Sequence, residues 1–203
     1  ARTLLRDGLL FYNDNENKKA LKNYKGIVAK YPYSSEAKEA VSNAKNVYID
    51  LGTIDEYAEW ARGISFINIT DAELDNTTYE SAENKFLAND VPKAIEGFKK
   101  YLLAFPEGLH ALQANFYLAQ LLVKTGSEKE AIPNYQYVID QPQSEYSEQA
   151  LNKLSQILLE EEEWVIAIPL LERLEEEANL PLNIVYAQSN LMKGYYQSER
   201  YIK

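Results

Sequence analysis

Apolar side chains recur at helical spacing along most of the chain, and short turns separate the helical stretches. Residues 112–126 illustrate the pattern. Their apolar members fall on one broad stripe of a helix, at Phe116, Leu118, Ala119, Leu122 and Val123. Gly126 ends this helix, and Ser127 with Glu130 has the spacing of a capping box that starts the next one. The pattern predicts a unit of two helices joined by a glycine turn.

This two-helix unit repeats along the chain. In the second helix of the unit, a small residue is followed four residues later by an aromatic residue or by leucine. The small residues are Ala20, Ala94, Ala131 and Ala167, and their partners are Tyr24, Phe98, Tyr135 and Leu171. Ala131 follows Ala94 by 37 residues. A repeat of this length favours an array of stacked helical hairpins.

Proline closes several of the units. Pro32, Pro106 and Pro142 follow the second helix, where a residue without an amide hydrogen ends helical hydrogen bonding. Residues 52–64 hold the remaining copy, but Tyr57 or Ala58 occupies its small-residue position and no proline closes it. The branched and aromatic run 64–70 predicts an irregular connection inside this second unit.

Capping residues predict two further helix starts, at Thr70 with Glu73 and at Thr77 with Glu80. A pair of helices of about 15 residues each cannot bury its own apolar face, so neighbouring units must stack into one continuous core. We therefore predict a single all-α repeat domain over residues 1–203. Its units are expected at residues 1–34, 35–71, 72–108, 109–144 and 145–181, with a partial unit at 182–203.

The repeated residues resemble the tetratricopeptide repeat (TPR), a helical hairpin with small residues in both helices, an aromatic residue four after the second small one, and a closing proline. The first unit carries the likeness at Gly8, Phe11, Ala20, Tyr24, Ile27 and Pro32. The resemblance implies a right-handed superhelical solenoid of about five hairpins plus one extra helix. Residues 182–196 resemble the first helix of a sixth unit and residues 198–201 its turn, which indicates a fragment of a longer repeat protein.

A narrower likeness concerns residues 31–40 and 105–119. In both stretches a proline is followed by a turn residue and then by a delayed helix with spaced alanines. This order is similar to the repeats of periplasmic proteins, namely the outer-membrane assembly lipoproteins and the Tol-Pal coordinator family. This likeness implies a periplasmic or outer-membrane-associated location, with the cytoplasm as the alternative.

The amino-acid composition limits the classes of partner that the chain is expected to bind. The formal net charge is −10 and the isoelectric point is near 4.8, so the long-range field repels phosphate backbones, and no nucleic-acid partner is expected. Cysteine is absent, which excludes disulfides and thiolate sites. No apolar run approaches the roughly 18 residues that a membrane span requires, so no direct membrane span is expected.

Candidate chemistry is sparse, and we expect no enzyme, no catalytic residue, no metal site and no cofactor. His110 is the only histidine, and no second one completes a ligand set. The glutamate runs 159–164 and 171–179 point around a helix by about 100° per residue, so they do not converge on one ion. The glycines lack the spacing of a phosphate-binding loop.

The resemblance implies that the first helix of each unit lines a concave surface that binds a protein or peptide partner. Sixteen tyrosines make such a surface plausible, because aromatic rings bring large contact area at low entropy cost. Carried over by position in the unit, the candidate binding residues are Tyr12, Tyr79, Phe116, Gln120, Lys124, Asn152, Gln156, Lys193 and Tyr196. The expected exposed apolar face of the last helix also leaves self-association open.

The alternative function is a glycan-binding module of a nutrient-capture lipoprotein, which also uses such repeats and stacks sugar rings on tyrosine and tryptophan. Members of that class carry long insertions between their repeats. In the present chain the repeats follow one another almost without insertions, which favours the protein-binding scaffold.

Overall fold

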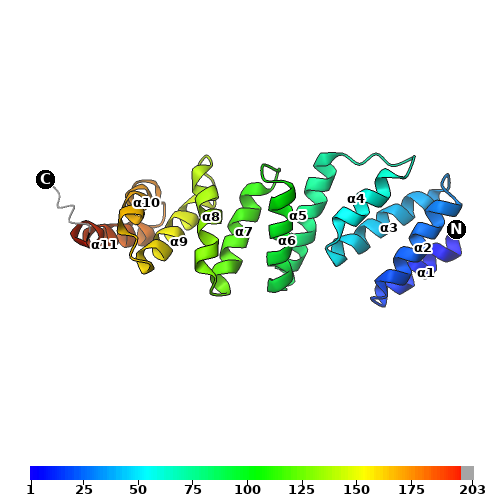
Figure 1. Cartoon of the computed structure of the whole chain (residues 1–203), viewed down its shortest axis with the longest axis horizontal. Helices are drawn as coiled ribbons and strands as arrows, with labels where there is room; N and C mark the ends of the chain where they lie inside the picture. Colours follow the sequence, from blue (N-terminus) through cyan, green and yellow to red (C-terminus); the bar gives the residue numbers. More distant parts are fainter. Residues whose placement is uncertain (198–203) are drawn as a thin grey trace. The chain divides into compact units, whose positions relative to one another are not determined.

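The computed structural model describes residues 1–197 as a chain of helices (Figure 1). Residues 198–201, which the sequence suggests as a turn, lie outside the described part. The described residues form eleven helices and no strand. The chain divides into two compact units, residues 1–109 and the residues from His110 onward. The predicted all-α fold of five hairpins plus one further helix is therefore confirmed for residues 1–197. A single domain over the whole chain stays a prediction.

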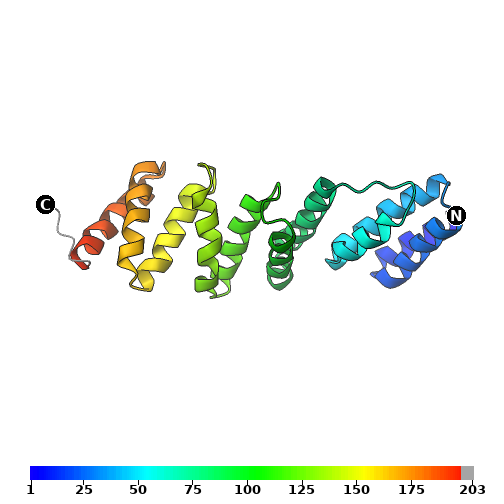
Figure 2. The same ribbon diagram turned by 45° about the horizontal axis from the view of Figure 1, so that its top comes forward.

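The first compact unit holds six helices. They are α1 (Arg2–Asn13), α2 (Asn17–Lys30), α3 (Ser35–Leu51), α4 (Ile54–Arg62), α5 (Asp71–Leu87) and α6 (Val91–Ala104). Each helix packs on the next in sequence, and α3 also contacts α1 and α5 (Figure 2). Adjacent hairpins therefore share one core, in which Tyr24, Ile27 and Val47 are fully buried.

The second compact unit holds the remaining five described helices. They are α7 (Ala111–Lys124), α8 (Glu128–Asp140), α9 (Ser147–Glu160), α10 (Trp164–Glu177) and α11 (Pro181–Gln197). Here too each helix packs on its successor in the sequence. None of the helices among residues 1–197 is long and apolar enough to cross a bilayer.

The small-residue positions are buried as predicted. Ala20, Ala94, Ala131 and Ala167 have no exposed surface. Helices α5 and α6 approach each other closely, since a side chain on Gly97 would place its Cβ 2.9 Å from the Cβ of Ala82. Small residues at these positions thus let paired helices come into near-backbone contact.

The turn inside each hairpin uses one residue in the left-handed conformation. These residues are Asn15, Gly52, Asn89, Gly126 and Glu162, with φ between 55° and 76°. They follow one another at intervals of 37, 37, 37 and 36 residues, so the repeat seen in the sequence is also a repeat of backbone geometry. Glycine and asparagine adopt this conformation readily, whereas glutamate does not.

Replacing Glu162 with glycine is expected to raise the free energy of unfolding by about 1 kcal/mol, because glycine removes the steric cost of a side chain at φ 60°. Urea denaturation of both chains measures the difference. Glu161→Gly is the matched control, since Glu161 has an ordinary φ of −83°. Glycine there adds flexibility to the unfolded chain and removes the exposed ion pair with Lys129, so it is expected to lower stability. If the Glu162→Gly chain were no more stable than the unchanged chain, the result would contradict a steric cost of the Glu162 side chain at this φ.

The three predicted capping residues differ in what they do in the structure. Thr70 caps α5 as predicted, since its hydroxyl accepts a hydrogen bond from the Glu73 amide at 3.1 Å. Ser127 does precede α8, but its side chain makes no capping hydrogen bond. The predicted helix start at Thr77 is wrong: Thr77 lies inside α5, and its hydroxyl donates to the Glu73 carbonyl at 2.7 Å. Back-bonding to the previous turn satisfies a threonine hydroxyl within a helix.

The predicted irregular connection at residues 64–70 is confirmed. Neither helix nor strand covers residues 63–70, which link α4 to α5. Ile64 is buried, and Phe66, Ile67 and Ile69 pack against the core of the first unit. Apolar side chains, rather than regular backbone hydrogen bonds, therefore hold this connection in place.

A buried carboxylate ties α5 to the end of its hairpin. Asp75 accepts hydrogen bonds from the Tyr101 hydroxyl at 2.6 Å and from the Leu109 amide at 2.8 Å. A side chain on Gly108 would place its Cβ 2.5 Å from that hydroxyl. The glycine after Pro106 is thus required by the close approach of this network.

Candidate binding surfaces

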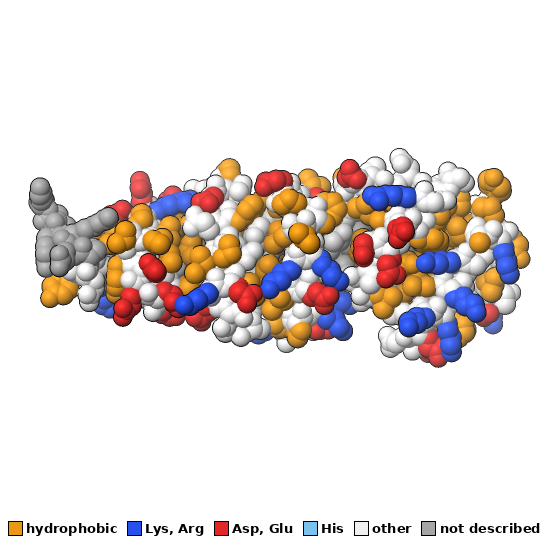
Figure 3. All heavy atoms as spheres, in the orientation of Figure 1, with side chains coloured by type: hydrophobic (Ala, Val, Ile, Leu, Met, Phe, Trp, Pro, Cys, Tyr) orange, Lys and Arg blue, Asp and Glu red, His pale blue; other side chains and the backbone are white. Residues whose placement is uncertain are grey.

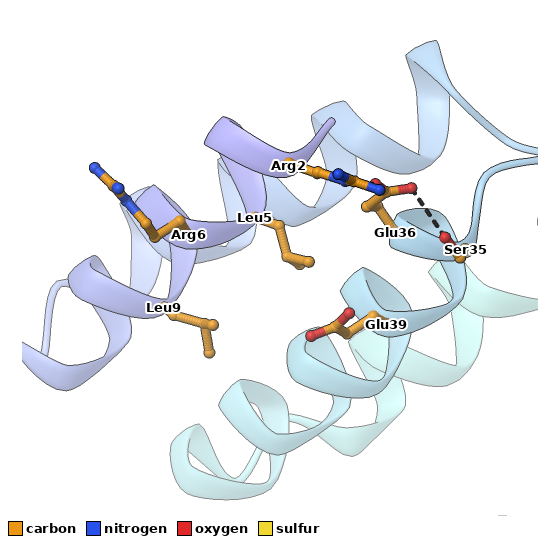
Figure 4. Close-up of a pocket in the computed structure, with 7 residues that line it drawn as sticks. All are labelled: Arg2, Leu5, Arg6, Leu9, Ser35, Glu36 and Glu39. Carbon is orange, nitrogen blue, oxygen red and sulfur yellow. Dashed lines mark hydrogen bonds and ion pairs between the residues drawn. The ribbon is translucent and has the colours of Figure 1, made fainter.

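The first unit has a hollow between two first helices, α1 and α3. It is lined by Arg2, Leu5, Arg6, Leu9, Ser35, Glu36 and Glu39 (Figure 4), a set we call the α1–α3 hollow. Leu5 and Leu9 point from α1 toward α3, and Glu39 points back toward them. Leu5 is buried whereas Leu9 remains 38% exposed. The hollow therefore offers an apolar floor with an acidic group beside it.

Charges of both signs border the α1–α3 hollow. The Arg2 Nε lies 3.0 Å from the Glu36 Oε1. The pKa of the Glu36 carboxyl lies below its ordinary value because its own backbone amide and then the Arg2 guanidinium hydrogen-bond to it. Arg6 points away from the hollow (Figure 4) and Glu39 has no ion-pair partner within residues 1–197. These two groups remain available to charges on a ligand.

Tyr12, one of the predicted binding residues, connects the same two helices. Its hydroxyl donates a hydrogen bond to the Asp50 carboxylate. Burial, followed by this hydrogen bond, raises the pKa of Tyr12 to about 12. The ring is half-buried, so Tyr12 both fixes α1 against α3 and contributes one edge to the surface.

Tyr79 and Phe116 are not surface residues, and the expectation that they project into a groove is wrong. Each is only 4% exposed. The Tyr79 ring lies 5.6 Å from the ring of Tyr101 and 6.0 Å from that of Phe98. The Phe116 ring lies 4.6 Å from the ring of Tyr146. Close packing of each first helix on its partner encloses these large rings between the helices.

The second unit presents a row of amide side chains on α9 and α11, which we call the amide row: Asn152, Gln156 and Asn183. The Asn152 Nδ2 donates to the Asn183 Oδ1 at 2.9 Å, and the Gln156 Nε2 donates to the Asn152 Oδ1 at 2.5 Å. The Lys153 ammonium donates to the Gln156 Oε1 at 3.1 Å. The structure thus brings together two of the predicted residues, Asn152 and Gln156, and adds Asn183.

The other predicted residues of this unit lie apart from the amide row in sequence and differ in exposure. Gln120 is half-buried on α7. Lys124 is exposed at the end of that helix, and Lys193 and Tyr196 are exposed near the end of α11. Tyr12, Tyr79 and Phe116 lie on α1, α5 and α7, whereas the amide row lies on α9 and α11.

Glu148 holds the start of α11, and the sequence did not point to it. Its carboxylate accepts hydrogen bonds from the amides of Asn179 and Leu180, each at 3.0 Å, and from the Asn183 Nδ2 at 2.7 Å. Desolvation raises the pKa of the Glu148 carboxyl, but these hydrogen bonds outweigh it and the net pKa is lowered. Glu148 stands more than thirty residues from its partners, so no local pattern could reveal this role.

Leu9 is not among the binding residues predicted from the sequence, although its spacing from Tyr12 indicates that it lies on the same surface. It lies three residues before Tyr12, and residues at that spacing share one face of a helix. The same reasoning would have added Leu5 and Arg2 to the surface.

Groups suited to catalysis or metal binding are sparse within residues 1–197. No cluster of three or more histidine, aspartate or glutamate residues could hold a metal ion there. His110 precedes α7, and its Nδ1 lies 3.4 Å from the Gln113 Oε1. On the face shown in Figure 3, basic side chains stand beside acidic and apolar ones. The surfaces described above therefore suit contact with another polypeptide better than with a polyanion.

Comparison with known proteins gives structural likenesses only. No protein-family model matches the sequence, and no curated protein matches it. The TPR domain of P58(IPK) is 18% identical with a TM-score of 0.45, and the match covers 96% of this chain and 55% of that one. YrrB, described as a TPR protein with an unusual peptide-binding site, is 15% identical with a TM-score of 0.45, over 92% of this chain and 90% of its own.

A third solved structure, BtubC from P. vanneervenii, is 14% identical with a TM-score of 0.48, over 91% of this chain and 82% of its own. The present chain spans about half the length of the P58(IPK) structure. These likenesses concern the arrangement of helices.

Proposed function

We propose that this protein is a binding scaffold that holds an extended segment of a partner protein along the first helices of its hairpins. The α1–α3 hollow is the observation that supports the proposal. It combines an apolar floor at Leu5 and Leu9 with the carboxylate of Glu39, which forms no ion pair with a basic side chain of residues 1–197. An extended peptide would place one apolar side chain on the floor and a basic side chain next to Glu39.

The amide row is a second candidate contact surface, in the second unit. Amide side chains can donate to and accept from peptide groups, so they hold a backbone with little dependence on sequence. Gln156 and Asn152 are half-buried and already fixed by hydrogen bonds, which lowers the entropy lost when a ligand binds. The proposed ligand chemistry is thus an apolar and basic peptide in the first unit and a peptide backbone in the second.

A library of displayed twelve-residue peptides selected against the chain tests this function. We expect enrichment of peptides with an apolar residue next to lysine or arginine. We expect Leu9→Asp to weaken binding of an enriched peptide at least tenfold, because a hydrated carboxylate replaces an apolar side chain of the floor and the apolar residue of the peptide loses its contact.

Leu103→Asp is the matched control, because Leu103 is 86% exposed on α6 and does not line the hollow. Equal binding of the enriched peptides to Leu9→Asp and to the unchanged chain would contradict the proposal, provided that far-ultraviolet circular dichroism shows both to be folded.

We further propose a periplasmic or outer-membrane-associated location. The likeness of residues 31–40 and 105–119 to periplasmic repeat proteins supports it. Fractionation of source cells followed by immunoblotting tests the location, and recovery in the cytoplasmic fraction alone would contradict it.

The glycan-binding alternative expects long insertions, whereas the longest non-helical stretch within residues 1–197 is 63–70.

A further inference from the structure

The first unit has a second hollow, which is lined by second helices rather than first ones. Its wall comes from α2, from the end of α4 and from the connection that follows α4. The residues that shape it are Lys25, Val28, Pro32, Trp60, Ile64 and Phe66, and we call it the α2–α4 pocket. Its volume is about 360 Å³, which lies within the range of small-ligand sites. It shares no residue with the α1–α3 hollow.

The short length of α4 creates this pocket. At 9 residues, α4 is shorter than every other described helix. It ends at Arg62, and an irregular connection follows it. Pro32 therefore lines one side of the pocket, and Phe66 lines the other. The departure of the second hairpin from the repeat pattern is thus what opens the site.

Aromatic and aliphatic groups make up most of the pocket. Val28 and Ile64 are buried and form the floor. Trp60 and Phe66 are half-buried and present parts of their rings. A ring or a branched apolar group would contact both aromatic side chains, because stacked and edge-on arrangements of rings are favourable.

Lys25 is the charged group of the pocket. Its Nζ lies 5.5 Å from the centre of the Trp60 ring and 5.4 Å from that of Tyr48. These cation–π contacts hold the ammonium over the aromatic rings. No carboxylate lines the pocket, and Lys25 forms no ion pair within residues 1–197. In a chain with 31 acidic and 21 basic residues, a half-buried cation without an acidic partner is available to an anion.

We propose that the α2–α4 pocket binds an apolar, preferably aromatic, group that carries a carboxylate. The apolar part lies between Trp60 and Phe66, and the carboxylate lies at the Lys25 ammonium. The C-terminal residue of a peptide and a free aryl carboxylate share this chemistry. The site is independent of the peptide surface proposed for the first helices, since the two are built on different residues.

Fluorescence of Trp60 tests the proposal in the full chain with Trp164→Phe, which leaves Trp60 as the only tryptophan. The probes are 3-phenylpropanoate and acetyl-Gly-Gly-Phe, each as the free acid and as the amide. We expect a saturable change in Trp60 emission with an acid, and binding of the matching amide about tenfold weaker, because a charge-assisted hydrogen bond is lost. Binding of both acids identifies the carboxylate itself as the ligand, whereas binding of the peptide acid alone identifies a peptide C-terminus.

Lys25→Met is expected to weaken acid binding about tenfold and to leave amide binding unchanged. Lys22→Met is the matched control, because Lys22 is exposed on the same helix and does not line the pocket. Thermal melts establish that both variants fold. Absence of saturable binding by either acid would overturn the proposal. Equal affinity for acid and amide in the chain with Lys25 intact would also overturn it, without relying on any change at Lys25.

Discussion

Replacing Phe98 with alanine is expected to lower the free energy of unfolding by about 3–5 kcal/mol. Phe98 is fully buried on α6, and its ring lies 6.0 Å from that of Tyr79 and 6.2 Å from that of Phe86. Truncation removes these contacts and leaves a cavity. The cavity cannot close by bringing α5 and α6 together, because Gly97 already lies against Ala82. The loss should therefore fall at the upper end of the usual range for a core residue.

Urea denaturation followed by circular dichroism measures the effect of Phe98→Ala. Leu103→Ala is the matched control, since Leu103 lies on the same helix but is 86% exposed; its expected effect is within about 0.5 kcal/mol. Similar stabilities of the two variants would contradict the placement of Phe98 in the core.

Replacing Tyr79 or Phe116 with alanine is expected to cost about 3–5 kcal/mol in each case. A side chain on an open groove would instead leave the free energy of unfolding nearly unchanged when it is truncated. Tyr79 packs between Phe98 and Tyr101, and its hydroxyl also donates to the Glu83 carboxylate at 2.9 Å. Each truncation therefore removes a ring from the space between two helices, and the two effects arise in different compact units.

Tyr33→Ala provides a matched control for Tyr79→Ala, because Tyr33 is 94% exposed and its loss should change stability by less than about 0.5 kcal/mol. Denaturation with guanidinium chloride, followed by tryptophan fluorescence and by circular dichroism, compares the variants. If Tyr79→Ala were as stable as Tyr33→Ala, the result would contradict the buried position of Tyr79 and support the surface position expected from the sequence.

The placement of binding residues was the less successful part of the sequence interpretation. Asn152 and Gln156 share a hydrogen bond, and their role in binding stays a prediction, whereas Tyr79 and Phe116 are enclosed. Position in the repeat identifies which helix a residue belongs to, but a rotation of the helix by a fraction of a turn decides between core and surface. That rotation depends on the size of the side chains in the facing helix, which a periodic pattern does not specify.

Residues that act through distant contacts could not be identified from the sequence. Glu148 binds amides more than thirty residues away, and Asp75 binds the Leu109 amide across a comparable separation. The α2–α4 pocket likewise depends on where α4 ends. Nothing in residues 54–62 ends the helix as clearly as a proline would, so the length of α4 follows from the packing of Ile64 and the residues after it against the core.

The sequence by itself determined the helical hairpin, its period and its buried small residues, because these depend on local propensity and on spacing along one chain. Alanine at four equivalent positions and the glycine turn at Gly126 follow from contacts inside a single repeat. Only the tertiary structure decided which first-helix side chains reach the surface, where the α1–α3 hollow and the α2–α4 pocket open, and which charges remain without partners. Those features depend on distances between helices that lie far apart in the chain, and packing rather than sequence spacing sets these distances.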